Sequence, residues 1–292
     1  MSDLELMVLT ILVGILTPFA IGLLIGIDRK ITARMQNRVG PPVLQPYYDL
    51  IKLFGKERRA MNSSQTVFAI ACMFLQLAAF VLLVTGGDLL VVFFVSSTGS
   101  FSLALGAFSA HSPFSYFGAQ RELLQILAYE PIVFMVIVAI GFRERTFLAG
   151  SVAHDLLFVL PLALIALLPV LVIKMEKSPY DIATAHTELI SGPYVEYSGT
   201  YLAITKIAHW FDLAILFGIM TLFFWDQNIW ISIGIKLLII LAFFFTAIVI
   251  DNTTARLTRN RMVKFTLAFG LALTAGNMLI LFLADQGVFR WP

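Results

Sequence analysis

Three carboxylates stand close together in one polar stretch of a chain that is otherwise strongly apolar. The stretch reads KSPYDIATAHTELISGPYVEYSG, residues 177–199, and its acids are Asp181, Glu188 and Glu196. A carboxylate in a low-dielectric site has a raised pKa and exchanges a proton when a nearby charge changes. These residues are therefore candidates for ion movement and coupling, and we expect no catalytic residue in this chain.

The local structure of this stretch decides whether its acids act together. If YDIATAHTELI forms a helix, Asp181 and Glu188 lie seven residues apart on one face. Gly192 and Pro193 then end the helix, and Glu196 stands at the start of the next apolar run. The simpler interpretation of Asp181 is a cap or a hydrogen bond within its own loop.

Two apolar runs also carry ionisable side chains, which are costly inside a membrane and usually face protein or water. Glu130 lies in one run, directly before Pro131. Lys206, His209 and Asp212 lie in another run at i, i+3 and i+6, so they cover about 120° of one helix face. We expect this stripe to continue a polar path through the protein. A satisfied structural network is the alternative.

The elements that position these residues are membrane-spanning helices. The chain of 292 residues is 59% hydrophobic and 13% charged, whereas soluble domains are roughly half apolar and a quarter charged. A spanning helix needs about 20 mostly apolar residues. The sequence predicts an all-α, polytopic membrane protein with a single membrane domain over 1–292. The expected spans are 4–27, 66–86, 89–110, 125–142, 156–174, 199–224, 229–250 and 263–284.

The distribution of positive charge predicts the orientation of these spans. If they alternate in direction, the loops 28–65, 111–124, 175–198 and 251–262 share one side and hold most of the lysines and arginines. The opposite loops hold only Arg143, Arg145 and Arg290. Positive residues favour the cytoplasmic side. We therefore expect a multi-pass protein of the cell membrane with both termini outside, whose first apolar run remains as a helix.

The first cytoplasmic loop is the candidate surface for a soluble partner protein. Its arginines recur at helical spacing until the sequence GPP at 40–42, and residues 47–57 predict an amphipathic helix along the membrane surface. Attachment to lipid alone is the alternative to protein docking. The candidate docking residues are Arg29, Arg34, Arg38, Tyr47, Tyr48, Asp49 and Lys52.

The cysteine content limits the cofactors that this chain can hold. Its one cysteine, Cys72, lies inside an apolar run. A disulfide needs two cysteines and an iron–sulfur cluster needs several ligands. We therefore expect no cofactor and no metal in this chain, and we expect membrane lipid rather than nucleic acid among its contacts.

Five long segments carry a resemblance to a known family. They are DRK…MQNRVGP, LQPYYDLIKLFGKE, GAQRELLQILAYEP, SPYDIATAHTELISGPYVEYSG and NTTARLTRNRMVKF. In these segments the chain resembles the NADH dehydrogenase subunit 1 family, which comprises the eight-helix membrane subunit of respiratory complex I and its counterparts in membrane-bound [NiFe] hydrogenases. The resemblance extends over nearly the whole chain.

The departures from this pattern favour one branch of the family. The compact segment GPPVLQP and the wording GAQRE…AYEP resemble the energy-converting hydrogenase type. Acids that are usual in complex I members are replaced at Lys174, Ala183, Thr184, His186 and His209, which argues against a quinone chamber like that of complex I. The carboxylates retained from the family pattern are Glu130, Asp181, Glu188 and Glu196.

The resemblance implies a non-catalytic membrane anchor and coupling subunit of an energy-converting [NiFe] hydrogenase complex. It implies partners in the form of hydrogenase large and small subunits, iron–sulfur subunits and an antiporter-like membrane subunit. Iron–sulfur clusters and a nickel–iron centre are then expected in those partners. Ferredoxin-dependent hydrogen chemistry would be coupled to the movement of H⁺ or Na⁺.

Two alternatives remain at the level of the sequence. One is a quinone-linked subunit of a complex I-type NADH dehydrogenase, which binding of a quinone-site inhibitor would favour. The other is a self-standing ion transporter. Such transporters commonly contain inverted repeats with interrupted helices, and we find no such repeat in the sequence.

Overall fold

The computed structural model describes the chain except for residues 1–2, 58–61, 153–155, 227 and 287–292, and its described part is helical with short connections. Arg290, one of the arginines predicted to lie outside, falls beyond the described residues. The helices are α1 (Asp3–Met35), α2 (Gln45–Phe54), α3 (Ser63–Val84), α4 (Leu89–Ser109), α5 (Pro113–Glu144), α6 (Leu156–Val159), α7 (Pro161–Lys174), α8 (His186–Leu189), α9 (Gly199–Thr221), α10 (Ile229–Thr253) and α11 (Arg259–Asp285).

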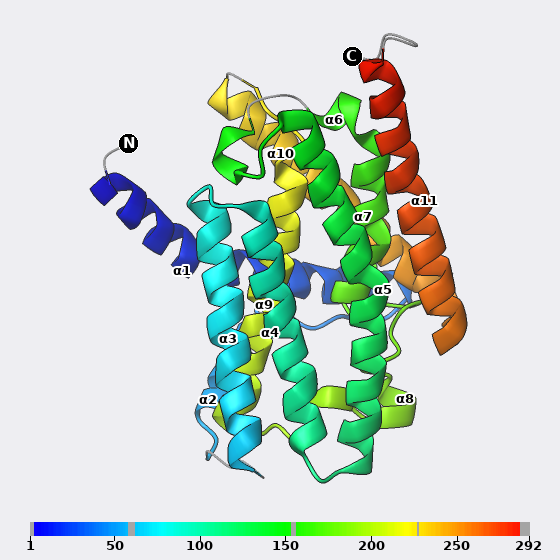
Figure 1. The fold of residues 1–292 in the computed structure, drawn as a ribbon. Helices are drawn as coiled ribbons and strands as arrows, with labels where there is room; N and C mark the ends of the chain where they lie inside the picture. The colour runs from blue at the N-terminus through cyan, green and yellow to red at the C-terminus, as the bar shows by residue number, and fades with distance from the viewer. Residues whose placement is uncertain (1–2, 58–61, 153–155, 227, 287–292) are drawn as a thin grey trace.

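Eight of these elements correspond to the eight expected spans. In the described chain, α1, α3, α4, α5, α9, α10 and α11 are long and apolar enough to cross a membrane, and α7 is a shorter apolar helix. Figure 1 shows α3, α4, α5, α7 and α11 running nearly parallel, with α2 and α8 at the end opposite the C-terminus. The prediction of an all-helical polytopic protein is confirmed.

Local sequence signals define where several helices begin. The side chains of Asn62, Asp88 and Asn228 accept hydrogen bonds from backbone N–H groups of the first turns of α3, α4 and α10. Such caps satisfy donors that have no partner within the helix. Pro113 and Pro161 stand in the first turns of α5 and α7, where a missing N–H group costs little.

The run 156–174 is not one continuous helix as expected, because it breaks between α6 and α7 at Pro161. The side chain of Asn277 in α11 forms hydrogen bonds with the backbone at this break. Its oxygen accepts hydrogen bonds from the N–H groups of Leu162 and Ala163, and its amide donates to the carbonyl of Val159. Backbone groups at membrane depth require such partners, so α11 supplies what the broken helix lacks.

Helix α1 crosses the other spans obliquely (Figure 1). Much of its middle part is exposed, including Ile11, Ile15 and Phe19. Its later turns contact the first loop so closely that a Cβ on Gly26 would lie 1.8 Å from the carbonyl oxygen of Val43. Glycine is therefore required at this approach of α1 to the segment before α2.

Helix α2 is amphipathic, as the sequence predicts. Its Leu50 and Leu53 are buried, whereas Tyr48, Ile51 and Lys52 are exposed. The buried face packs against α1 and α9. The helix therefore forms part of the protein and is not simply laid on a lipid surface.

The connection from α7 to α9 folds back against α5 and departs from the expected helix. The segment around Asp181 lacks helical structure, and only His186–Leu189 forms a single turn. The carbonyl of Ile182 would accept a backbone hydrogen bond if this segment were a helix. It accepts one from the side chain of Arg121 in α5 instead, at 3.1 Å. Gln125 likewise donates to the carbonyl of Tyr180. The prediction that Asp181 and Glu188 share a helix face is wrong.

Candidate functional site

A cavity of about 560 Å³ lies between α1, α2, α9, α10 and the α7–α9 connection, and we call it the first cavity. Its wall is divided by chemistry. Leu24, Leu213, Phe217 and Phe244 are among the residues of its apolar part. The charged part contains Asp28, Glu176, Lys177, Asp181, Lys206 and His209. The first cavity therefore brings residues of the polar stretch together with the ionisable stripe of α9.

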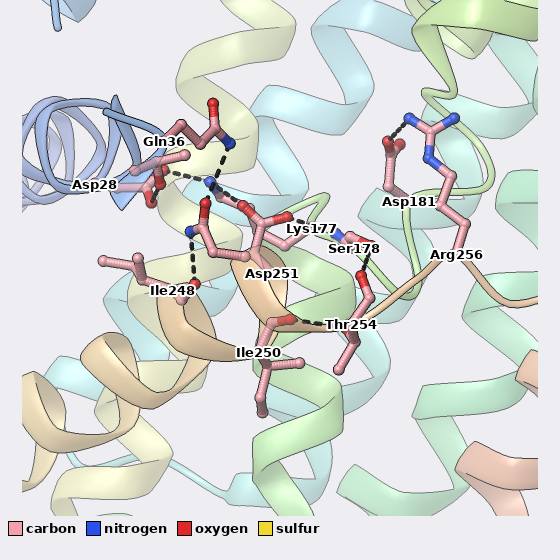
Figure 2. A network of polar contacts seen from close by, with 12 residues as sticks. Asp28, Gln36, Lys177, Ser178, Asp181, Ile248, Ile250, Asp251, Thr254 and Arg256 are labelled. Carbon is pink, nitrogen blue, oxygen red and sulfur yellow. Dashed lines mark hydrogen bonds and ion pairs between the residues drawn. The ribbon is translucent and has the colours of Figure 1, made fainter. Parts of the chain in front are cut away.

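Lys177 connects three elements at the wall of the first cavity. Its ammonium lies 2.8 Å from a carboxylate oxygen of Asp28 in α1 and 3.0 Å from one of Asp251 in α10. Figure 2 shows the lysine between these two acids. The other oxygen of Asp251 accepts the backbone N–H of Ser178 at 3.0 Å, and Thr32 donates to Asp28.

The electrostatics of this cluster favour a charged lysine. Burial by itself lowers the pKa of Lys177, but the charges and hydrogen bonds of Asp28 and Asp251 outweigh this effect and raise the pKa above its ordinary value of 10.5. All three side chains are largely buried, at 16%, 7% and 17% exposed for Lys177, Asp28 and Asp251. The cluster is therefore a charge-assisted clamp between α1, α10 and the connection.

Asp181 has a local partner and a distant one. It accepts a hydrogen bond from the hydroxyl of Thr184 at 2.9 Å, within its own loop. It also pairs with Arg256, which follows α10, at 2.5 Å (Figure 2). Both Asp181 and Arg256 line the first cavity. The loop hydrogen bond considered from the sequence is thus present alongside a long-range ion pair.

A second cavity, of about 40 Å³, adjoins the first, because Glu176, Tyr194 and His209 line both. The phenol of Tyr194 interacts with the charge of Glu176. Other residues of this second cavity include Glu122 of α5 and Asp212 of α9. The stripe on α9 is therefore divided, with Lys206 on the first cavity, Asp212 on the second and His209 on both.

A third cavity, of about 20 Å³, shares Ser100, Tyr129 and Lys174 with the second. Glu130 and Ser97 both line this third cavity. Polar groups therefore follow one another from the first cavity to the middle of α5.

A buried ion pair stands within this series. The Lys174 ammonium lies 2.5 Å from a carboxylate oxygen of Asp212, and their side chains are 9% and 10% exposed. The same oxygen of Asp212 accepts a hydrogen bond from Ser96 at 3.2 Å. The side-chain amide of Gln76 in α3 donates to the backbone carbonyl of Ser96 at 3.1 Å. The pair is supported by hydroxyl and amide groups from α3 and α4.

Glu188 and Glu196 are not among the residues that line these three cavities. Glu188 is 56% exposed and pairs with Arg121 of α5 at 2.6 Å. Glu196 is half-buried between the 3₁₀ turn at Gly192–Tyr194 and α9. The structure therefore separates these acids from the cavities, although they belong to the connection that forms part of the wall of the first one.

The candidate docking residues divide into two groups. Arg34 and Arg38 are exposed beyond the membrane-facing part of α1, and Tyr48 and Lys52 are exposed on α2. The others make contacts within the chain. Arg29 pairs with Asp49 at 3.2 Å, and Tyr47 donates to the carbonyl of Phe19 and packs against the rings of Phe19 and Trp210.

Sequence reasoning missed Glu122, Glu176 and Lys177, and it did not place Lys174 in the path. Glu122 lies in the quoted segment GAQRELLQILAYEP, but the expected span began at residue 125 and excluded it. The available signal was an acid followed by Leu123 and Leu124 in a segment that leads directly to Glu130. Glu176 and Lys177 offered no periodic signal, because they lie in a loop.

Comparison with known proteins gives the family. Residues 6–282 match the family model described as NADH dehydrogenase. Hydrogenase-4 component C of Escherichia coli (strain K12) is 30% identical in an alignment of 263 residues that covers 79% of this chain and 82% of that protein. Formate hydrogenlyase subunit 4 of the same strain is 33% identical in an alignment of 215 residues that covers 67% of this chain and 70% of that protein.

A solved structure agrees with these matches. One chain in the structure of the membrane-bound sulfane sulfur reductase, an archaeal respiratory membrane complex, superposes with a TM-score of 0.83 at 26% identity. The superposition covers 94% of this chain and 99% of that one. These relatives are subunits of membrane complexes. The present chain belongs to the NADH dehydrogenase subunit 1 family of multi-pass membrane proteins.

Proposed function

We propose that this chain is the membrane anchor and coupling subunit of an energy-converting [NiFe] hydrogenase complex. It would link ferredoxin-dependent hydrogen chemistry in soluble subunits to translocation of H⁺ or Na⁺. Family membership and the similarity to hydrogenase-4 component C and formate hydrogenlyase subunit 4 support this assignment. The observation that carries the coupling role is the series of three cavities with shared linings.

The proposed path begins at the first cavity, next to the connection that faces the soluble partners. Glu176 and His209 pass the charge change to the second cavity, where Glu122 and Asp212 lie. Glu130 receives it in the third cavity. Asp181, Glu188, Glu196 and Lys206 act at the entrance, by responding to the charge of the partners. A carboxylate in such surroundings changes its proton occupancy when a neighbouring charge changes.

The partners and the orientation follow from the same proposal. Hydrogenase large and small subunits and iron–sulfur subunits would dock on the exposed arginines of the first loop, and these subunits would carry the iron–sulfur clusters and the nickel–iron centre. An antiporter-like subunit would lie beside this chain in the membrane. Both termini of the chain would lie on the outer side of the cell membrane, because the described loops rich in lysine and arginine would face the cytoplasm.

The test of the coupling role is a reconstituted complex. The complex is purified through a tag on a soluble subunit, inserted into proteoliposomes and supplied with reduced ferredoxin. Hydrogen evolution together with formation of an ion gradient supports the proposal. Hydrogen evolution without formation of an ion gradient, in vesicles shown to be sealed, contradicts the coupling role.

A second candidate is a quinone-linked complex I-type subunit, which the size of the first cavity favours. Small-molecule sites commonly have volumes of about 300–1,000 Å³, and the first cavity has such a volume and an apolar part beside its charged part. The same vesicles distinguish the candidates when protons, sulfane sulfur and a quinone are offered in turn as electron acceptors. Quinone reduction blocked by a quinone-site inhibitor would favour the second candidate.

A further inference from the structure

Lys174 occupies the point at which the second and third cavities meet. It is at the end of α7, and it lines both cavities together with Ser100 and Tyr129. Among the described residues that line these two cavities there is no other lysine or arginine. A single positive side chain therefore stands between the part of the path that holds Glu122 and the part that holds Glu130.

The ammonium of Lys174 is held in place from two directions. Asp212 binds it at 2.5 Å, and the ring of Tyr129 lies beneath it with the centroid 5.0 Å away. Ion pairing and the negative face of an aromatic ring both stabilise a cation. Since Asp212 is also bound by Ser96, the charge has a defined position and does not swing freely.

The acids on either side of Lys174 interact with it. Glu122 feels the charge of Lys174 from the second cavity, and Glu130 feels it from the third. Glu176 lies further along the second cavity, toward the first. The sequence of charges along the path is therefore acid, ammonium, acid.

This arrangement treats a proton and a metal cation differently. The cavities, of about 40 and 20 Å³, have room for only a few water molecules, so a sodium ion would have to shed most of its hydration shell. It would then meet a fixed positive charge in surroundings of low dielectric constant, where like charges repel strongly. A proton does not need to pass the ammonium, because a lysine can release one proton and accept another.

We propose that the Lys174–Asp212 pair makes this path selective for protons and excludes sodium ions. The inference rests on the coupling function proposed above and names the ion that moves through this chain. In the transfer step, a proton leaves Nζ of Lys174 toward the Glu130 carboxylate. The neutral amine is then protonated again from the Glu122 side. One proton enters and one leaves, so the lysine returns to its original charge.

The test measures proton uptake per electron pair in proteoliposomes of the intact complex, over a series of sodium concentrations. In the wild-type complex, we expect the ratio to be independent of sodium. In Lys174→Gln, both the proton relay and the positive charge are removed, and Asp212 is left as a buried anion that attracts cations. We therefore expect proton uptake to be lost at every sodium concentration and sodium uptake to appear as sodium is raised.

The variant Lys174→Arg separates the exclusion of sodium ions from the transfer of protons. Arginine keeps the positive charge but is not deprotonated in proteins. We expect proton uptake in this variant to be lost at every sodium concentration, with electron transfer intact in vesicles treated with an uncoupler. A purely structural role of the ion pair would instead be restored by arginine, so uptake at the wild-type ratio in Lys174→Arg overturns the proposal.

A double variant without charge at either position tests whether misfolding explains the effects of the single substitutions. The double variant Lys174→Met with Asp212→Asn removes both charges together, which avoids leaving one buried charge unpaired. We expect this complex to assemble, to lose proton uptake and to admit sodium. An assembled double variant whose proton uptake equals that of the wild type overturns the inference. If the wild-type complex forms no gradient of either ion, the coupling function itself fails, which is a different result.

Discussion

The ammonium of Lys177, in the connection after α7, lies 2.8 Å from the carboxylate of Asp28 in α1. The two residues are far apart in sequence, and with Asp251 they hold α1, α10 and the connection together at the first cavity. The clamp therefore ties α1 and α10 to the connection after α7.

We predict that Lys177→Met lowers thermal stability, because it leaves Asp28 and Asp251 without their counter-charge. Removing one partner of a buried ion pair costs about 3–5 kcal/mol. Lys56→Met, on an exposed site of the first loop, is the matched control. Thermal unfolding of the purified complex measures the difference, and equal melting temperatures for Lys177→Met and the control would contradict the clamp.

The same cluster predicts that thermal stability depends on pH in the alkaline range. The pKa of Lys177 is raised in the folded protein, so the folded state binds the proton more tightly than the unfolded state. Its contribution to stability is present below the ordinary pKa of 10.5 and is lost as pH rises through the folded value. The melting-temperature difference between wild type and Lys177→Met should therefore shrink above this pH. A difference that stays constant would argue against the clamp.

Glu130→Gln should uncouple the complex without dissociating it. The substitution keeps the shape and the ability to accept hydrogen bonds but removes the titratable proton at the third cavity. Hydrogen chemistry with artificial electron carriers should persist, while ion uptake in sealed vesicles falls. Glu57→Gln, in the exposed part of the first loop, serves as the control. Unchanged ion uptake in Glu130→Gln would reduce Glu130 to a structural role.

Charge reversal in the first loop should detach the soluble subunits. Arg34 and Arg38 are exposed and lie on the side of the described basic loops, and like charges placed together at an interface cost several kcal/mol. Arg34→Glu with Arg38→Glu should leave this chain in the membrane but abolish co-purification of the cluster-bearing subunits. The control is the same reversal at Arg143 and Arg145, which are exposed at the other end of α5. Full co-purification after the first pair of changes would exclude docking through these arginines.

Glu188→Gln and Glu196→Gln should change coupling more than stability. The Glu188–Arg121 pair is more than half exposed on the acid's side, and such pairs contribute about 0–1 kcal/mol. Arg121 also retains its bond to the carbonyl of Ile182, so the connection stays attached to α5. The measurements are thermal stability and ion uptake per hydrogen evolved. Ion uptake per hydrogen evolved at the wild-type ratio in both variants would show that this connection has a structural role only.

The spans could be predicted from sequence because apolar length is a direct requirement of the bilayer. Their ends were less predictable. Helix α5 begins at Pro113 rather than near residue 125, because its first turns contain polar residues that a search for apolar runs leaves out. Helix α1 continues to Met35 past Asp28 and Arg29, since those charges face protein or water rather than lipid.

The site was predictable only where an ionisable residue stood out against an apolar background. Glu130, His209 and Asp212 were found in this way, and the structure places them along adjoining cavities. The non-helical course around Asp181 could not be read from its sequence, because side chains of α5 bind its carbonyl groups. Those bonds join residues more than fifty positions apart, and no local pattern encodes them.

Helix α1 has 33 residues, and its apolar run 4–27 is about 36 Å long, somewhat longer than the hydrocarbon thickness of about 30 Å. A helix of this length accommodates the bilayer by tilting, and the tilt depends on lipid chain length. Because Ile21, Leu24 and Ile25 of this helix form one wall of the first cavity, thicker or thinner bilayers act mechanically on that wall. Acyl-chain length is therefore an experimental variable in its own right for every reconstitution of this protein.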